Sequence, residues 1–173
     1  HDQTIQVPDL VKIGIAHYQF ETIHPFLDGN GRIGRLLITL YLLSKGIMNK
    51  PLLYLSSYFE KNRQLYYDNL TNVRTKNDMT LWLKYFLVGI EDTATKSINT
   101  LTEVIRLKDT VEQEIRASYG RRTQSALTLL QSLLINPVTN VERAKKTCGL
   151  SYKATNDLIA QMQKSGYLKE LTG

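Results

Sequence analysis

The sequence holds little cysteine, little proline and no long hydrophobic run. A single cysteine, Cys148, excludes an internal disulfide framework and a metal site built from several cysteines, and it suits a reducing, cytoplasmic compartment. The longest apolar stretch, residues 33–43, is interrupted by Gly34, Arg35 and Thr39 and has about half of the ~20 residues that cross a bilayer. We therefore expect a globular protein without a membrane span.

Charge is unevenly distributed along the chain. The 173 residues include 22 Lys and Arg against 16 Asp and Glu, a formal net charge of +6. Residues 121–173 alone contribute +5, from eight basic and three acidic side chains, so we expect an acidic partner for this part of the chain. The start, HDQTIQVPDL, has no signal-peptide pattern. Because it begins with His rather than Met, we expect a fragment.

The spacing of apolar residues predicts an almost entirely helical chain. A first helix is expected to end near Ile23, before a proline, with Val11, Ile15 and Tyr18 at roughly helical spacing. The polar His17 beside this stripe is expected in the core.

Three further segments in the first two thirds of the chain also have a helical pattern. Residues 32–45 are apolar on nearly all faces, which is typical of a buried central helix. Residues 57–74 are predicted as one amphipathic helix. Asp78 is a good N-cap for the stretch up to Gly120, which is either one very long helix or two helices that meet near Gly89.

The run HPFLDGNGRIGR, from His24 to Arg35, carries the chemistry. A Gly-Asn-Gly turn opens into an apolar helix, whose first backbone N–H groups have no partner within the helix and lie at the positive end of its dipole. Gly29 and Gly31 leave room for a bulky anion, so this junction predicts a phosphate cradle. Arg32 and Arg35 can reach the same anion, and guanidinium groups suit phosphate oxygens.

Two more residues complete the predicted site. Asp28 precedes the cradle, where one carboxylate and the phosphates commonly hold Mg²⁺. His24 suits a base that takes a proton from an attacking hydroxyl. A DGNG turn alone is common and a lone histidine is usually structural, but an arginine within an apolar helix needs an anionic partner. Together these residues predict phosphoryl or nucleotidyl transfer.

These twelve residues resemble the Fic family signature, HPFx(D/E)GNGRxxR, at every fixed position. The flanking segments AHYQFETI and LSSYFEKNRQLYYDNL also resemble this family, which is helical and most often transfers AMP from ATP to a Ser, Thr or Tyr hydroxyl of a target protein. The resemblance implies that His24 deprotonates this hydroxyl, which attacks the α-phosphate, and that Asp28 holds Mg²⁺. It places the phosphates on the backbone of Gly29, Asn30 and Gly31 and on the side chains of Arg32 and Arg35.

Other roles concern residues around this run. We expect Gly34 to let the motif helix approach a neighbour closely, as part of the nucleotide site or as packing alone, and Phe26 to anchor the loop in the core. The resemblance implies that Tyr67 contacts the adenosine end of the nucleotide. Packing against the motif helix is the alternative for Tyr67, and equally for Asn62 and Tyr66.

Residues 121–173 resemble a winged helix-turn-helix, a module often appended to Fic cores. Helical patterns lead into a tight Gly149-Leu150-Ser151 turn, a further helix follows, and an extended segment begins near Leu168. Cys148 is expected to act as a small buried hydrophobe. The side chains that would allow phosphate contacts are Arg143, Lys145, Lys146, Lys153 and Lys164. A DNA partner and a protein or dimerisation partner both stay open.

The expected fold is therefore an all-α Fic core followed by a small winged helix-turn-helix domain, which is α-helical with a short β wing. The core is expected over residues 1–92, without its N-terminal part, a connecting helix over 93–120 and the winged domain over 121–173. We expect the wing to be missing or cut short after Gly173.

Three functions are compatible with these residues. The first is a protein adenylyltransferase that uses ATP and Mg²⁺, modifies a hydroxyl side chain of a target protein or of itself, and releases pyrophosphate. The second is a nucleotide-sensing DNA-binding regulator. The third is de-AMPylation, or another nucleotide or phosphate transfer, by the same site. His24 favours an enzyme, because a sensor has no need of a base.

Overall fold

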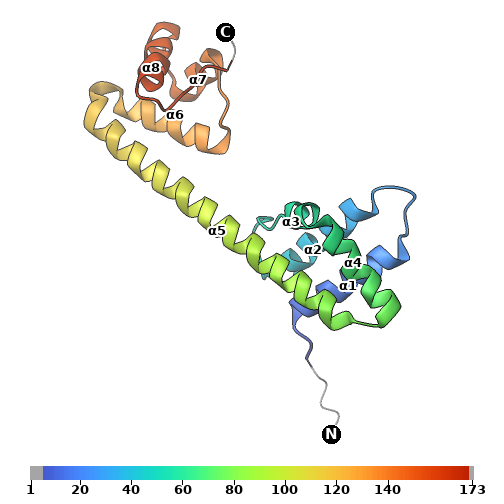
Figure 1. Cartoon of the computed structure of the whole chain (residues 1–173). Helices are drawn as coiled ribbons and strands as arrows, with labels where there is room; N and C mark the ends of the chain where they lie inside the picture. Colours follow the sequence, from blue (N-terminus) through green and yellow to red (C-terminus); the bar gives the residue numbers. More distant parts are fainter. Residues whose placement is uncertain (1–5, 172–173) are drawn as a thin grey trace. The chain divides into compact units, whose positions relative to one another are not determined.

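The computed structural model describes residues 6–171, which are predominantly helical and include no β-strand (Figure 1). The chain divides into two compact units, His1–Leu101 and Thr102–Gly173. Each unit has a hydrophobic core of its own. Within the described part of the chain, every helix is too short or too polar to span a bilayer.

The first unit is built from α-helices whose positions largely follow the apolar spacing. They are α1 (Asp9–Ile23), α2 (Asn30–Ser44), α3 (Leu55–Lys61), α4 (Arg63–Lys76) and the first part of α5 (Met79–Ser118). The predicted end of the first helix at Ile23 is confirmed. Of the two alternatives for the stretch before Gly120, the structure has one long helix.

The prediction of a single helix over residues 57–74 is wrong. The backbone leaves helical geometry at Asn62, with φ −112° and ψ 36°, and the segment forms α3 and α4 instead. The Asn62 Nδ2 donates a hydrogen bond to the Tyr58 carbonyl over 2.8 Å. The Asn62 backbone N–H donates to the same carbonyl over 3.1 Å, so the asparagine closes the end of α3 with both its backbone and its side chain.

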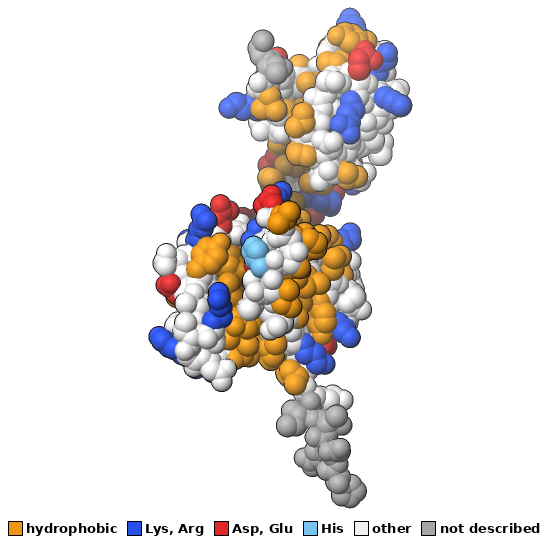
Figure 2. All heavy atoms as spheres, turned by 90° about the vertical axis from the view of Figure 1, so that its right-hand side faces the viewer, with side chains coloured by type: hydrophobic (Ala, Val, Ile, Leu, Met, Phe, Trp, Pro, Cys, Tyr) orange, Lys and Arg blue, Asp and Glu red, His pale blue; other side chains and the backbone are white. Residues whose placement is uncertain are grey.

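The faces that α1 and α2 bury differ from the predicted ones. Of the expected stripe on α1 only Tyr18 is buried, since Ile15 points to solvent. On α2 the buried residues follow one line, Asn30, Gly34, Ile38 and Leu42. The opposite side of α2 is exposed, so this helix is not the fully buried one that its composition predicts. Figure 2 shows hydrophobic side chains over much of one face of this unit.

A close approach between α1 and α2 explains which face each helix buries. A Cβ atom added to Gly34 would lie 2.5 Å from the Glu21 Oε1 and 3.1 Å from the His17 Cε1. Only a residue without a side chain permits this distance, in agreement with the close approach predicted for Gly34. Gly14 serves α1 in the same way, with the Phe86 Cδ1 at 2.9 Å from its added Cβ position.

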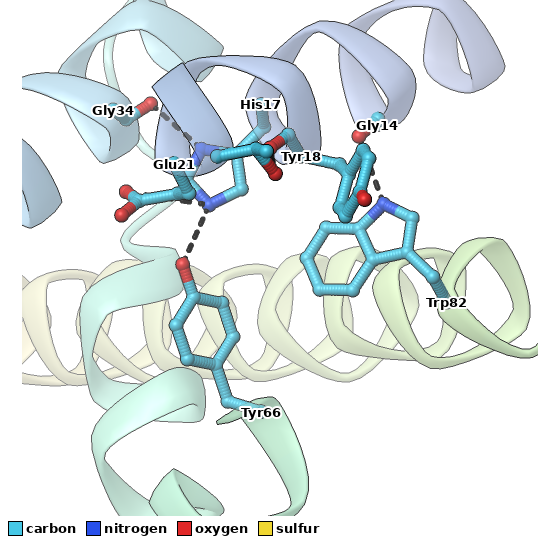
Figure 3. A network of polar contacts seen from close by, with 8 residues as sticks. Gly14, His17, Tyr18, Glu21, Gly34, Tyr66 and Trp82 are labelled. Atoms are coloured by element: carbon cyan, nitrogen blue, oxygen red, sulfur yellow. Dashed lines mark hydrogen bonds and ion pairs between the residues drawn. The ribbon is translucent and has the colours of Figure 1, made fainter. Parts of the chain in front are cut away.

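A buried polar chain joins three of these helices (Figure 3). The His17 Nδ1 lies 3.1 Å from the Gly34 carbonyl oxygen on α2, and its Nε2 lies 3.0 Å from the Tyr66 hydroxyl on α4. A carbonyl can only accept, so Nδ1 carries the proton and the Tyr66 hydroxyl donates to Nε2. Burial lowers the pKa of His17 to about 4, which keeps the ring neutral. The core position expected for His17 is confirmed.

The core of the first unit is rich in aromatic rings. The Trp82 and Phe86 side chains of α5 are fully buried, and the His17 ring lies 6.0 Å from the Trp82 ring and 5.7 Å from the Phe59 ring, centre to centre. The Trp82 Nε1 donates to the Gly14 carbonyl over 2.9 Å. This bond gives the buried indole N–H a partner and fixes α1 against α5.

The second unit contains the end of α5 and a cluster of short helices. These are the 3₁₀ turn η1 (Gly120–Arg122), α6 (Thr123–Ile135), α7 (Val141–Cys148) and α8 (Tyr152–Lys164). Ile115, Leu129, Leu158 and Met162 are completely buried and form its core. Cys148 is only partly buried, and its thiol lies 3.4 Å from the Ser125 carbonyl oxygen.

The second unit has α7 and α8 joined by the predicted tight turn, whereas the wing is not seen among the described residues. Residues 165–171, which follow α8, form no strand, because a strand requires a paired segment and none occurs within residues 6–171. The β wing therefore stays a prediction from the sequence. Residues 172 and 173 lie outside the described part of the chain.

Gly34→Ala should destabilise the first unit by about 1–3 kcal/mol, because the new methyl group meets the fixed His17 ring. Helix propensity alone predicts the opposite sign. Urea unfolding followed by the fluorescence of Trp82, the single tryptophan of the chain, reports on this unit. Leu40→Ala, on the exposed side of the same helix, is the matched control and should lower the free energy of unfolding by less. A Gly34→Ala variant as stable as the parent would contradict the packing described for α1 and α2.

The His17 ring should stay neutral, with its proton on Nδ1, until the pH falls to about 4. In the unfolded chain the pKa of this histidine is near 6.5. Neutral His17 therefore contributes its full stabilisation of the fold above pH 6.5, and this contribution is lost as the pH falls toward 4. Histidine NMR signals followed from pH 8 to pH 4 measure this directly, and His17→Gln identifies the signal. A midpoint above pH 6 for that signal would contradict the buried chain.

Candidate functional site

The loop between α1 and α2 is shaped by two residues in the left-handed region. His24 ends α1 with φ 51° and ψ 57°, and its N–H donates to the Phe20 carbonyl. Gly29 precedes α2 with φ 83°, a conformation that glycine adopts without strain. The left-handed turn at His24 exposes its imidazole at the end of α1.

Asn30 closes this loop with its side chain. Its Nδ2 donates to the Phe26 carbonyl over 2.6 Å, and its Oδ1 accepts from the Phe26 N–H over 2.9 Å. The side chain of Asn30 is buried, whereas that of Phe26 is 47% exposed. The prediction that Phe26 anchors the loop in the core is therefore wrong. The anchor is the backbone of Phe26, held by an amide that can donate and accept at once.

The first turn of α2 has no side-chain cap. Its first intrahelical bond runs from the Ile33 N–H to the Gly29 carbonyl over 3.0 Å, so the N–H groups of Asn30, Gly31 and Arg32 precede the hydrogen-bonded ladder. This is the geometry expected of an anion cradle, with the positive end of the α2 dipole behind it.

Both motif arginines fold back toward this turn. The Arg35 Nη1 lies 3.1 Å from the position that a Cβ on Gly31 would take, and the Arg32 Nη2 lies 3.6 Å from that of Gly29. The glycines therefore leave space for guanidinium groups as well as for an anion. Arg32 also forms an ion pair of 3.3 Å with Asp28, and both side chains are largely exposed, so this pair contributes little stability.

Asp28 stands at the outer edge of the cradle with its side chain 93% exposed. One of its oxygens, Oδ1, accepts from the Gly29 N–H over 2.7 Å. Within residues 6–171 no cluster of three or more His, Cys, Asp or Glu side chains could hold a metal ion. The donor set fits Mg²⁺ that is bound by one carboxylate, with phosphate oxygens and water as the remaining ligands.

A cavity of about 270 Å³ brings several predicted residues together. His24, Gly31, Arg35 and Tyr67 all line it. Arg35 and Tyr67 also line a neighbouring hollow of about 250 Å³ with Arg63, whose guanidinium carbon lies 5.8 Å from the centre of the Tyr67 ring. Arg35, Tyr66 and Tyr67 therefore line both hollows.

The structure separates the remaining candidates. Tyr67 is 52% exposed, whereas Tyr66 is buried and bonded to His17, although both side chains line the two cavities. Asn62 belongs to the junction of α3 and α4. Gly34 packs against α1 and does not line either cavity. A larger cavity of about 400 Å³, between α3 and α5, has none of the motif residues in its wall.

Glu21 is a site residue that the sequence analysis missed. Its side chain is 10% exposed, and it lines the cavity that His24 and Arg35 share. The Glu21 Oε1 and the Arg35 Nε are both buried without a hydrogen-bond partner among the described residues. Burial raises the pKa of the Glu21 carboxyl, an effect that the charges of Arg35 and His24 partly offset. The anionic neighbour required by an arginine in an apolar helix is thus partly supplied by α1.

Comparison with known proteins matches one segment of the chain. Residues 2–42 match the Fic/DOC family. A probable protein adenylyltransferase of Aquifex aeolicus is 52% identical over 42 residues, which are 24% of this chain and 13% of that protein. Protein adenylyltransferase fic-1 of Caenorhabditis elegans and that of Caenorhabditis briggsae are each 40% identical over 45 residues, 26% of this chain and 9% of theirs.

The match to these relatives is local. It covers 13% and 9% of the length of the proteins named above. The family match runs through the described parts of α1, the loop and α2 up to Leu42, and so includes the residues of the cradle. In this segment the chain is similar to the Fic/DOC family.

Proposed function

We propose that this chain carries protein adenylyltransferase activity, in which AMP moves from ATP to a Ser, Thr or Tyr hydroxyl of a target protein or of the chain itself. The observation that carries the proposal is the placement of His24 and Arg35 on one cavity beside the uncapped first turn of α2. The names of the relatives that share this segment support the same reaction.

Binding of the triphosphate is the first step of the proposed reaction. The backbone N–H groups of Asn30 and Gly31 point to the anion, with the Arg32 and Arg35 guanidinium groups on its outer phosphates. The exposed ion pair between Asp28 and Arg32 opens at little cost when phosphate oxygens replace the carboxylate. The ring of Tyr67, which is exposed, would contact the adenosine end of the nucleotide.

Transfer follows from the position of His24. The imidazole takes the proton of the target hydroxyl while that oxygen forms a bond to the α-phosphorus. The bond between the α-phosphorus and the oxygen bridging to the β-phosphate breaks, and pyrophosphate leaves with the electron pair. A positioned base contributes on the order of 10²–10⁴ to the rate. Fixed N–H groups and guanidinium charges stabilise the charge that develops on the phosphate oxygens.

Asp28 would hold Mg²⁺ in this site. When bound, the ion would neutralise phosphate charge and orient the leaving group. The backbone bond from the Gly29 N–H fixes the orientation of the Asp28 carboxylate toward the cradle.

Two other functions share these residues. Removal of AMP, or transfer of another phosphate-bearing group, would use the same base and cradle. A nucleotide-sensing regulator would use the cradle alone. The exposed imidazole of His24, which lines the same cavity as Arg35, favours an enzyme over the sensor.

Incubation with ATP labelled at the α-phosphate should label a target protein or the chain itself, whereas ATP labelled at the γ-phosphate should not. His24→Ala should reduce the label at least ~100-fold, since the base is lost. Leu40→Ala, remote from the cradle, should keep the activity of the parent. Label from γ-labelled ATP alone would refute AMP transfer, and nucleotide binding with no transfer would favour the sensor.

Arg35→Ala should weaken ATP binding about tenfold or more, because a charge-assisted bond to phosphate is lost. Calorimetric titration with ATP and Mg²⁺ measures this affinity independently of any target protein. The matched control is Arg106→Ala on α5, which removes an equal charge from an exposed position far along the chain. Equal losses for the two variants would show that Arg35 acts only through net charge.

A further inference from the structure

The second unit contains a helix-turn-helix whose turn is fixed by named contacts. Gly149 ends α7 with φ 64°, and the following N–H of Leu150 donates to the Lys145 carbonyl over 3.3 Å. The Ser151 Oγ then accepts from the Ala154 N–H over 3.3 Å and caps α8. A left-handed glycine followed at once by an N-cap sets the crossing of α7 and α8.

Two sides of α8 are already occupied. Thr155, Leu158 and Met162 are fully buried in the core of this unit. On a second side, the Arg122 guanidinium lies 3.3 Å from the Asp157 Oδ2 and 3.2 Å from the Gln161 Oε1. These contacts hold α8 firmly in the unit, and they pair the acidic residue of α8 with a cation.

The third side of α8 is a polar strip made of Lys153, Asn156, Ala160 and Gln163. Their spacing of three, four and three residues puts them on one face of the helix. Lys153, Ala160 and Gln163 are exposed and Asn156 is partly exposed. The strip has no acidic side chain, and the small Ala160 at its centre permits close approach of another surface.

Cations lie at the ends of this strip and beside the turn that precedes α8. Lys153 and Lys164 are at the two ends of the strip, and α7 adds Arg143, Lys145 and Lys146 beside the turn, where Glu142 lies 4.0 Å from Lys145. Figure 2 shows Lys and Arg side chains projecting from this unit at several points. Residues 121–173 carry a net charge of +5. Such an arrangement suits a polyanion whose charges lie on both sides of a groove.

We propose that this unit binds duplex DNA, with the polar strip of α8 in the major groove and the cations of α7 on the phosphates. Lysine, asparagine and glutamine are side chains that read guanine and adenine edges in that groove. A protein partner is disfavoured because the centre of a protein interface is typically apolar and poor in charge. Duplex RNA is disfavoured because its major groove does not admit a helix.

The proposal stands apart from the adenylyltransferase activity, since it uses none of the residues of the α1–α2 loop. Fluorescence anisotropy of the whole chain with a labelled duplex of random sequence tests it between 50 and about 300 mM salt. With about four phosphate contacts, the logarithm of the binding constant should fall against the logarithm of salt with a slope of about −3 to −4. A binding constant that does not change with salt concentration would overturn the proposal.

A charge-matched pair of variants locates the contact. Lys146→Ala combined with Lys153→Ala should weaken binding about tenfold or more and make the slope shallower by about 1, because of these two only Lys146 is placed on a phosphate. Arg106→Ala combined with Arg116→Ala removes the same charge from exposed positions on α5 and should change the affinity less. All four side chains are exposed, so folding, checked by circular dichroism, should persist. Equal losses of DNA affinity in both pairs of variants would overturn the assignment of the DNA contact to α7 and α8.

Asn156→Ala tests base reading separately from charge. Duplexes selected from a random pool by the parent chain should share a sequence, and the variant should lose about 5- to 150-fold of the preference at one base pair while its salt slope stays unchanged. Equal binding of single-stranded and duplex DNA would overturn the placement of α8 in a groove. If the Asn156→Ala variant keeps the base-pair preference of the parent chain, the base-reading role of Asn156 is overturned.

Discussion

The buried hydrogen-bond chain through His17 is the interaction on which the site depends. It connects the α2 backbone at Gly34 with the α4 hydroxyl of Tyr66, through a ring that belongs to α1. The motif residues are distributed over these same three helices, since α1 ends at His24, α2 begins at the cradle and α4 carries Tyr67. A neutral imidazole donates from one nitrogen and accepts at the other, so it can bridge the Gly34 carbonyl, an acceptor, and the Tyr66 hydroxyl, a donor, that belong to different helices. This connection holds α1, α2 and α4 together, and residues of these three helices line the cavity around Arg35.

The sequence predicts well those features that short patterns encode. The HPFLDGNGRIGR run places a cradle at the start of α2, and the structure brings His24, Gly31 and Arg35 to one cavity. The end of α1 before Pro25 follows from a local backbone restriction. The helix-turn-helix of the second unit follows from Gly149 and Ser151, because a left-handed glycine and an N-cap are both local signals.

Features that depend on distant partners could not be predicted. Glu21 reads as an ordinary polar residue until α2 brings Arg35 beside it, and the break at Asn62 has no glycine or proline to announce it. The composition of α2 predicts burial on all sides, yet burial depends on what surrounds the helix. The bonds of the Asn30 side chain could have been predicted, because asparagine in a turn often bonds to nearby backbone. The Gly-Asn-Gly pattern, however, indicates a role for the Asn30 backbone alone.

The left-handed backbone of His24 has an evolutionary consequence. A residue with a β-carbon in this conformation is strained, and glycine would relieve that strain at the end of α1. Glycine has no imidazole, however, so a residue without backbone strain at this position would leave the cavity without its base. At this one position, selection for a robust fold and selection for chemistry pull in opposite directions.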